Sequence, residues 1–253
     1  MRYRFTRVCY ALAATAAVTT TLGLSAVGAA SASASTHAVK PAATPSCGPG
    51  CVNLYSQEFG PHQVQGVYRG SVTSGRGSRI VLSQASNSQP GEDFTVNVVA
   101  PVSVLCATWP APGSLSPTSY ACLNYRFPLG VFQVLEANYQ PYGSPTSLCA
   151  GVSSRVPFSG EGVSLQSCGS PNSEWVVDTN NFTFFFNPPF PPSGPYAPLV
   201  NAGDTPSSGP QVLTVETTHR SPRHPLVTER LNRFSDGTVS DSQQWGVFFG
   251  TAP

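Results

Sequence analysis

Apolar residues occur along this chain in short runs, separated by turn-forming Gly, Pro, Asn and Ser. Runs rich in Val, Leu, Phe, Ile, Tyr and Trp are typical of strands, because these side chains suit a half-buried pleated surface. Long amphipathic helical patterns are absent from the sequence. The pattern therefore predicts an all-β protein, either a sandwich or a barrel. The expected strands are residues 51–55, 80–82, 94–99, 131–135, 163–165, 175–177, 212–215 and 245–249.

Three segments of the chain share one order of features. Each has a short apolar strand, a second strand after a polar turn, and an aromatic residue that follows polar residues. The segments end at Phe94, Trp175 and Trp245, and they begin at Cys51, Leu148 and Leu199. The repetition indicates a fold built from three related units.

These segments resemble the repeats of ricin-type β-trefoil lectins, which mark each of three repeats with a Gln-any-Trp motif. The third segment keeps the whole motif as Gln243-Gln244-Trp245. The second has Ser173 in place of the Gln, and the first has Glu92 and Phe94 in place of the Gln and the Trp. The resemblance covers most of residues 51–250, with long insertions at residues 101–130, 182–196 and 216–233.

The resemblance implies a β-trefoil with long loop insertions. In such a fold the terminal aromatic residue of each repeat packs into a shared core, where a large ring buries a large apolar area. We therefore expect Phe94, Trp175 and Trp245 to be core residues rather than ligand-binding residues. Over its whole length the chain is also similar to exported proteins of actinobacteria, a likeness that adds nothing about its role.

The sugar site of ricin-type lectins uses an early Asp, an aromatic platform after the second strand, and an Asn beside the motif Gln. By our alignment the early Asp position holds Asn53, Gly151 and Asn201. The platform position holds Ser83, Gln166 and Thr214, none of which is aromatic. The second repeat keeps the Asn, the third keeps the Gln, and an Asp follows Asn201 as a stand-in for the missing carboxylate. The candidate ligand-binding residues from the resemblance are Asn201, Asp204, Asn172 and Gln243.

A second candidate for binding lies outside the repeat pattern, in the segment between Cys106 and Cys122. This segment holds Trp109 and Tyr120, with Tyr125 just beyond it. A disulfide-closed loop that displays aromatic rings is a suitable recognition surface. The alternative is that these rings cover the edge of the core beneath a long insertion.

The first 32 residues have the features of a secretory signal peptide. Arg2, Arg4 and Arg7 precede an uncharged stretch rich in Ala, Val, Leu and Thr, and Ala30-Ser31-Ala32 is a small-residue cleavage pattern. An uncleaved membrane anchor is the alternative, since a span needs roughly 20 apolar residues. Cleavage predicts a secreted protein without a remaining membrane span. Residues 33–45 then form a flexible leader, and residues 46–253 form one β-trefoil-like domain rather than two smaller ones.

Six cysteines remain after Cys9 leaves with the signal, and an even number in an exported chain predicts three disulfides. Their clustering along the chain favours Cys47–Cys51, Cys106–Cys122 and Cys149–Cys168 among 15 possible pairings. The spacings do not match those of paired zinc ligands, and no cysteine is left over as a catalytic thiol. We therefore expect no metal and no cofactor.

Charged residues make up only 10% of the chain. Loss of the three signal arginines changes the formal net charge from +1 to about −2. A negative net charge argues against a nucleic-acid partner, which needs a basic face to neutralise phosphate. The remaining arginine cluster is expected in a solvated loop: Arg220, Arg223, Arg230 and Arg233.

The sequence contains no nucleophile elbow, no His-Glu-any-any-His motif and no phosphate-binding glycine loop. Most Asp and Glu residues stand beside Gly, Pro, Ser or Asn, as turn residues do. We therefore expect a non-catalytic protein. Two hypotheses follow: a carbohydrate-binding module with a glycan or cell-surface partner, and an exported interaction or structural protein that kept the trefoil and lost the sugar site.

Overall fold

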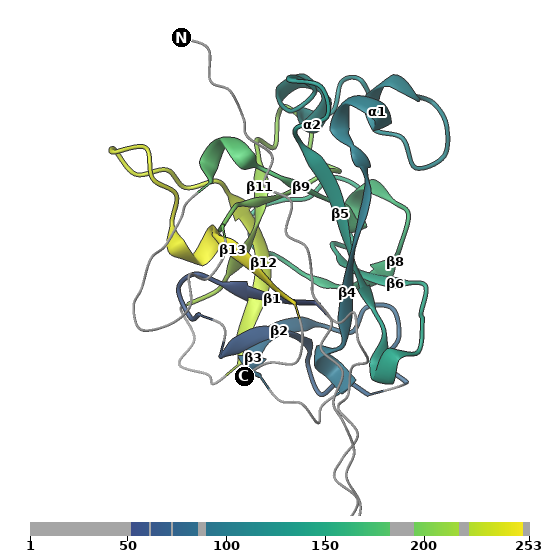
Figure 1. The fold of residues 1–253 in the computed structure, drawn as a ribbon, viewed down its shortest axis with the longest axis vertical. Helices are drawn as coiled ribbons and strands as arrows, with labels where there is room; N and C mark the ends of the chain where they lie inside the picture. The colour runs from purple at the N-terminus through teal and green to yellow at the C-terminus, as the bar shows by residue number, and fades with distance from the viewer. Residues whose placement is uncertain are drawn as a thin grey trace, which may run out of the picture. The chain divides into compact units, whose positions relative to one another are not determined.

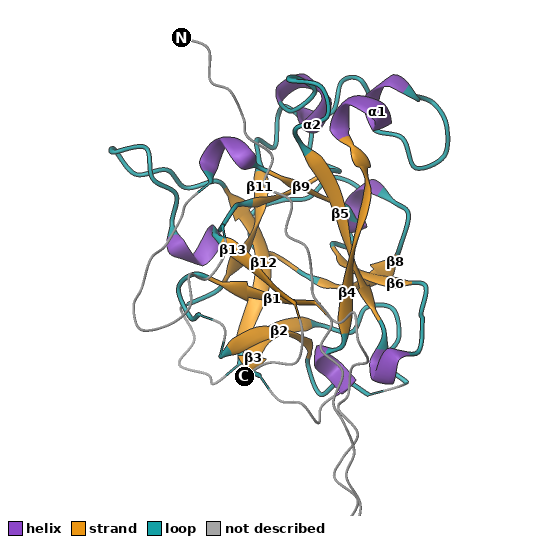
Figure 2. Cartoon of the chain, viewed as in Figure 1, coloured by secondary structure: helices purple, strands orange, loops and turns teal. Residues whose placement is uncertain are grey.

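Six short antiparallel strands form a barrel in the computed structural model, which describes residues 52–60, 62–71, 73–85, 90–182, 195–217 and 223–249. These strands begin and end each of the three repeats (Figure 1, Figure 2). They are β1 (Val52–Ser56), β4 (Phe94–Pro101), β5 (Gln133–Tyr139), β9 (Trp175–Val177), β10 (Leu199–Asn201) and β13 (Trp245–Phe249).

The barrel strands follow one another around a ring. Between repeats, β4 pairs with β5, β9 with β10, and β13 with β1. Within repeats, β5 pairs with β9, a bridge from Ala197 to Trp245 joins the start of the third repeat to its end, and β1 lies against β4. The first strand of the first repeat thus meets the last strand of the third, which closes the ring.

Each repeat also contains a two-stranded hairpin. The hairpin strands are β2 (Gln63–Val67) with β3 (Ile80–Gln84), β6 (Leu148–Gly151) with β8 (Ser164–Ser167), and β11 (Gln211–Val215) with β12 (His224–Arg230). A further short strand, β7 (Glu161–Gly162), pairs with β12.

The three hairpins meet at equivalent residues. The Ile80 N–H donates to the Val163 carbonyl at 2.9 Å, and the Val163 N–H donates to the Leu226 carbonyl at 2.8 Å. β12 in turn pairs with β3, which completes the contact among the three hairpins. A six-stranded barrel with three mutually contacting hairpins is a β-trefoil, and the predicted fold class is confirmed.

The core of the trefoil contains the three terminal aromatic residues. Phe94, Trp175 and Trp245 are all buried in one apolar cluster. The Trp175 indole N–H donates to the Ala150 carbonyl at 2.9 Å, and the Trp245 indole N–H donates to the Leu213 carbonyl at 2.7 Å. Each repeat ends with a single 3-10 turn ahead of its aromatic residue: η1 (Pro90–Glu92), η3 (Pro171–Ser173) and η5 (Asp241–Gln243). The expectation that these aromatics form the core is confirmed.

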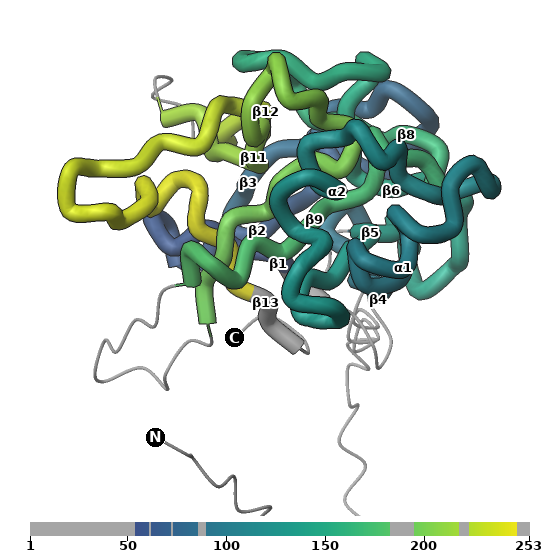
Figure 3. The backbone as a smooth tube through the Cα atoms, turned by 90° about the horizontal axis from the view of Figure 1, so that it is seen from above, coloured from purple at the N-terminus to yellow at the C-terminus, as the bar shows by residue number. Residues whose placement is uncertain are grey.

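The insertion between β4 and β5 carries two short helices, α1 (Val102–Ala107) and α2 (Tyr120–Asn124). Figures 1 and 3 both place α2 beside β5 and β9. Apolar side chains of the insertion form a second core cluster against these strands, with Leu105, Leu115 and Tyr125 packed in the same cluster as Val134 and Val176. The Cys106–Cys122 disulfide ties the two helices together, as predicted.

The predicted Cys149–Cys168 disulfide is also present, and it joins β6 to the end of β8. The predicted Cys47–Cys51 pair, the signal segment and the leader lie outside the described residues. None of the helices in the described part of the chain has the length and apolar character that a membrane span requires.

One predicted loop is wrong. Residues 216–233 were expected as an insertion with a solvated arginine cluster, yet His224–Arg230 forms β12. The strand is hidden in the sequence because its three consecutive buried residues, Leu226, Val227 and Thr228, include a polar threonine, whose hydroxyl donates to the Phe158 carbonyl at 2.9 Å. Arg230 therefore ends a strand, and Arg220 lies outside the described residues.

Candidate functional site

A cavity of about 560 Å³ opens between the β4–β5 insertion and the second and third repeats. Four segments line it: the loop that follows α1, the loop that follows β6, the η3 turn, and the turn between β10 and β11. A pocket of this size is within the range of small-molecule sites, roughly 300–1,000 Å³. The lining residues include Trp109, Ser119, Arg155, Asn172, Asp204 and Thr205.

Trp109 is the aromatic wall of the cavity, and 51% of its surface is exposed. The loop that carries it is held at both ends by the Cys106–Cys122 disulfide. Leu115 anchors the middle of the loop, because it is fully buried and its N–H donates to the Leu105 carbonyl at 3.1 Å. The indole is therefore an exposed ring on a restrained loop. This is what the sequence analysis predicted for a recognition surface in the segment between Cys106 and Cys122.

Asp204 contributes the only carboxyl group among the lining residues. It is 1% exposed, and its Oδ2 accepts the Gln211 N–H at 2.6 Å. Its Oδ1 is buried without a hydrogen-bond partner among the described residues. Burial raises the pKa of Asp204 to about 8, although the Gln211 hydrogen bond lowers it in part. Near neutral pH the group is a carboxylic acid, which both donates and accepts hydrogen bonds.

The Asp204 backbone also joins the cavity walls. Its carbonyl accepts the Tyr120 N–H at 3.0 Å, so the β10–β11 turn is bonded to the first residue of α2. The insertion and the third repeat are thereby held together where they line the cavity.

Asn172 lines the cavity from the second repeat. Its side-chain amide donates to the Val152 carbonyl at 2.7 Å, and its Oδ1 accepts the Ser170 hydroxyl at 2.6 Å. The side chain is thus fixed in one orientation, with one N–H and one oxygen lone pair still available.

Asn201 does not line the cavity. It is fully buried on β10, its amide donates to the Asn172 carbonyl at 3.2 Å, and its Oδ1 accepts the Gly203 N–H at 3.0 Å. These bonds place Asn201 as a support for the η3 turn and the β10–β11 turn, which both line the cavity.

Gln243 is also separate from the cavity. Its amide donates to the Thr214 hydroxyl at 3.2 Å and to the Arg230 carbonyl at 3.0 Å, and its Oε1 accepts the Asn232 N–H at 2.8 Å. All of these partners belong to the third repeat. The structure therefore brings together three of the five predicted residues, Trp109, Asn172 and Asp204.

The strand register corrects the alignment of the early Asp position. In the three hairpins, Gly66 pairs with Val81, Gly151 with Ser164, and Thr214 with Val227. Val81, Ser164 and Val227 are equivalent, because each directly follows one of the residues at which the hairpins meet, Ile80, Val163 and Leu226. Asn53 and Asn201 instead lie on barrel strands, opposite Phe248 and Trp175. The early Asp position is therefore occupied by Gly66, Gly151 and Thr214.

A carboxylate could not be accommodated at the second of these positions. A Cβ added to Gly151 would lie 2.5 Å from the Asn172 carbonyl oxygen, so the close approach of η3 requires glycine. The platform position of the third repeat must also be reassigned. β12 is the strand equivalent to β3 and β8, so this position is Glu229 on β12 and not Thr214 on β11. No repeat combines the acidic and aromatic positions of the family's sugar site.

Arg155 is a lining residue that the sequence reasoning missed. It is exposed and lies in a Ser-Ser-Arg stretch that follows β6. Arg155 is the cationic residue among those that line the cavity. Hydroxyl groups also surround the cavity, on Ser114, Ser116, Thr118, Ser119, Ser153 and Thr205. A search for polar residues in the loops that follow the strands of the second repeat would have identified Ser153 and Arg155.

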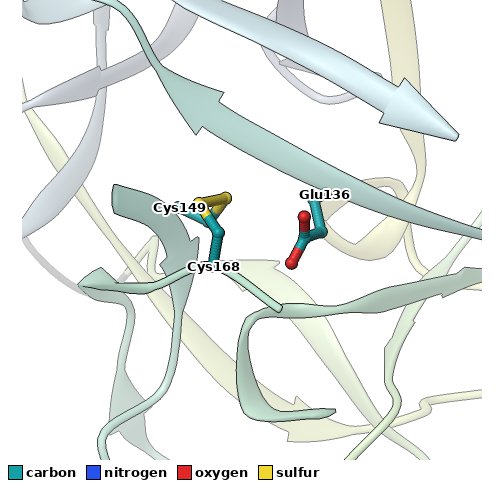
Figure 4. Close-up of side chains that lie close together, drawn as sticks. All are labelled: Glu136, Cys149 and Cys168. Atoms are coloured by element: carbon teal, nitrogen blue, oxygen red, sulfur yellow. A yellow bond between two sulfur atoms is a disulfide. The ribbon is translucent and has the colours of Figure 1, made fainter. Parts of the chain in front are cut away.

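Glu136, Cys149 and Cys168 lie close together elsewhere, with possible ligand atoms within 4.8 Å of one another. Figure 4 shows the two sulfur atoms bonded to each other beside the Glu136 carboxylate. A disulfide offers no thiolate, so these three residues are not a sulfur-ligated metal centre.

No protein-family model matches the chain, and no curated protein matches it. Solved structures do match in part. The designed three-fold symmetric protein ThreeFoil has a TM-score of 0.45 and 13% identity, covering 78% of this chain and 97% of its own. A mosquitocidal holotoxin has a TM-score of 0.44 and 12% identity, covering 79% of this chain and 17% of its own. The SDF2-like protein from Arabidopsis thaliana has a TM-score of 0.41 and 7% identity, covering 80% of this chain and 94% of its own. The assignment of the trefoil rests on the strand pairing described above.

Proposed function

We propose that this protein is an exported, non-catalytic carbohydrate-binding module, and that its ligand binds in the cavity lined by Trp109, Asn172 and Asp204. The observation that carries the proposal is the meeting of an exposed indole and a buried, incompletely bonded carboxyl group in one cavity. Export is supported by the signal-like first 32 residues and by two disulfides, which persist in oxidising compartments.

A sugar matches this combination of groups. One face of a pyranose ring is apolar and stacks on an indole, while its hydroxyls need donors and acceptors that are already oriented. The cavity offers Trp109 as the flat surface, Asn172 as a fixed amide, and a ring of hydroxyl groups. A volume of about 560 Å³ suits a mono- or disaccharide.

A glycan array on the purified protein, followed by calorimetric titration of the best ligand, tests this proposal. Trp109→Ala is expected to raise Kd about tenfold or more, because removing a stacking surface costs roughly 1.4 kcal/mol. Asp204→Ala is expected to abolish micromolar binding, with near-UV circular dichroism as the check that the variant folds.

Phe234→Ala is the matched control, since Phe234 is a similarly exposed aromatic residue that does not line the cavity. Its Kd should equal that of the unmodified protein. Silence across the array, or a Trp109→Ala variant with unchanged affinity, would reject the sugar site in this cavity.

The second candidate function is an exported interaction or structural protein without a working sugar site. It is favoured by the residues at the early Asp position, Gly66, Gly151 and Thr214, none of which carries a carboxylate. A silent array together with a stable, folded protein would support this second candidate.

A further inference from the structure

A row of oxygen-bearing side chains crosses one face of β4, β5 and the residue before β9, and none of these side chains lines the cavity described above. Glu136 faces Asn97 across the β4–β5 ladder, and Asn138 faces Thr95. Glu174 lies one position beyond the β5–β9 pair Leu135–Trp175, next to Glu136. Directly opposed residues in antiparallel strands point to the same face, as do residues two apart on one strand. These five side chains therefore share one face.

Three oxygens of this row are buried without a hydrogen-bond partner among the described residues: Glu174 Oε2, Asn138 Oδ1 and Thr95 Oγ1. The Glu174 side chain is only 1% exposed. The Asn138 amide nitrogen is already committed, because it donates to the Thr146 carbonyl at 3.0 Å, which leaves its oxygen as the unused end. Buried polar atoms are normally satisfied, so three orphaned oxygens on one face call for a missing partner.

The charge on this face has no cationic partner among the described residues: Glu136 Oε1 accepts the Gly169 N–H, which is a neutral donor. No Lys or Arg forms an ion pair with Glu136 or Glu174 in the described part of the chain. Burial, and after it the neighbouring Glu136 carboxylate, raise the pKa of Glu174. Glu136 lies on β5 and Glu174 lies just before β9, and two carboxylates placed side by side repel each other unless a proton or a cation lies between them.

We propose that Glu136 and Glu174, together with the Asn138 carbonyl oxygen, bind a calcium ion. Every available donor is a carboxylate, amide or hydroxyl oxygen, which is the set that hard cations prefer. The nearby sulfurs are bonded in a disulfide and offer nothing to a softer metal. Calcium tolerates irregular geometry and water ligands, and the row opens to solvent at Asn97, which is exposed.

The proposal is independent of the sugar site, because none of these five residues lines the cavity. Its test is thermal unfolding of the purified protein after chelation, with about 10 mM CaCl2 or with NaCl at equal ionic strength. With a Kd of about 0.1–1 mM, typical of extracellular calcium modules, Tm should rise by about 3–10 °C in CaCl2. MgCl2 should give a much smaller rise, since magnesium demands near-ideal octahedral geometry.

Glu174→Gln separates a cation site from a merely strained pair. Removal of the repulsion should leave Tm without calcium unchanged or higher, while the calcium-dependent rise should be lost. Glu136→Gln, at a half-buried position, should lose the same rise and serves as the second variant in case Glu174→Gln does not fold.

Glu229→Gln is the matched control, because Glu229 is a half-buried glutamate on β12 with Val212 opposite. It should keep the full calcium-dependent rise. The proposed site would be overturned if calcium did not change the Tm of the unmodified protein. It would also be overturned if Glu136→Gln and Glu174→Gln showed the same calcium-dependent rise as the unmodified protein. An equal rise in MgCl2 would overturn its assignment to calcium.

Discussion

At the scale of single residues, Asp204 couples folding to pH. The pKa of its buried carboxyl is about 8, against about 3.9 for an unfolded chain. Between these values the folded protein holds a proton that the unfolded chain releases, so stability falls as pH rises. The expected slope from this one group is up to about 1.4 kcal/mol per pH unit from about pH 4 to pH 8, and zero above pH 8.

The variant Asp204→Asn isolates this contribution. An amide keeps an acceptor oxygen for the Gln211 N–H but cannot ionise. In urea unfolding at several pH values, the free energy of Asp204→Asn minus that of the unmodified protein should increase from pH 4 to pH 8. Other carboxyls cancel in this difference. Profiles of Asp204→Asn and the unmodified protein that run parallel from pH 4 to pH 8 would refute the assignment.

The residue scale also shows what one sequence can and cannot place. Trp109 was identified from its disulfide-closed loop. Asn201 came from an alignment in which β10 stood for β6, and Asp204 came from the same alignment, as a stand-in for the carboxylate missing at Asn201. The error arose because barrel strands and hairpin strands have similar short apolar patterns, and only hydrogen-bond register distinguishes them.

At the scale of elements, the Cys106–Cys122 loop links stability to the display of Trp109. Closing a loop with a sequence separation of 16 stabilises a fold by roughly 3 kcal/mol in the chain-entropy model. The double variant Cys106→Ser/Cys122→Ser should lose about that amount in urea unfolding. It should also be cleaved faster by protease between α1 and α2, and it should bind any cavity ligand more weakly.

The Cys149→Ser/Cys168→Ser variant provides the comparison for this element. Its disulfide joins strands of a trefoil hairpin at a sequence separation of 19, and neither cysteine lines the cavity, although Ser153 and Arg155 within the closed loop do. A similar loss of stability without added cleavage between α1 and α2 is expected. Equal cleavage in both double variants would show that the Cys106–Cys122 bond does not restrain the loop.

Elements with strong apolar runs were predicted correctly, as in β9 and β13, whose bounds match the sequence pattern. The two helices of the insertion were not predicted, since six and five residues are too few for a helical period to be recognised. Their stability comes from packing against β5 and β9, which is a tertiary effect. β12 was missed because a buried threonine interrupts its apolar pattern.

At the scale of the whole molecule, three non-identical repeats share one core. In the second and third repeats an indole N–H bonds to the hairpin carbonyls of Ala150 and Leu213, whereas Phe94 has no such donor. The threefold arrangement was predictable because each repeat ends in a large aromatic ring. The difference between the repeats was not predictable, since hydrogen bonds between distant strands cannot be inferred from a sequence motif.

This inequality leads to the last prediction. Trp175→Phe and Trp245→Phe each remove one buried hydrogen bond and part of a buried ring, and each should lower the free energy of unfolding by about 1–3 kcal/mol. Because both rings pack in the same cluster, the double variant should deviate from the sum of the single effects by more than about 0.5 kcal/mol. Urea unfolding of the two single variants and the double variant measures this coupling. Strict additivity would mean that the repeats stabilise the protein independently, and that the pseudosymmetric core is not one cooperative unit.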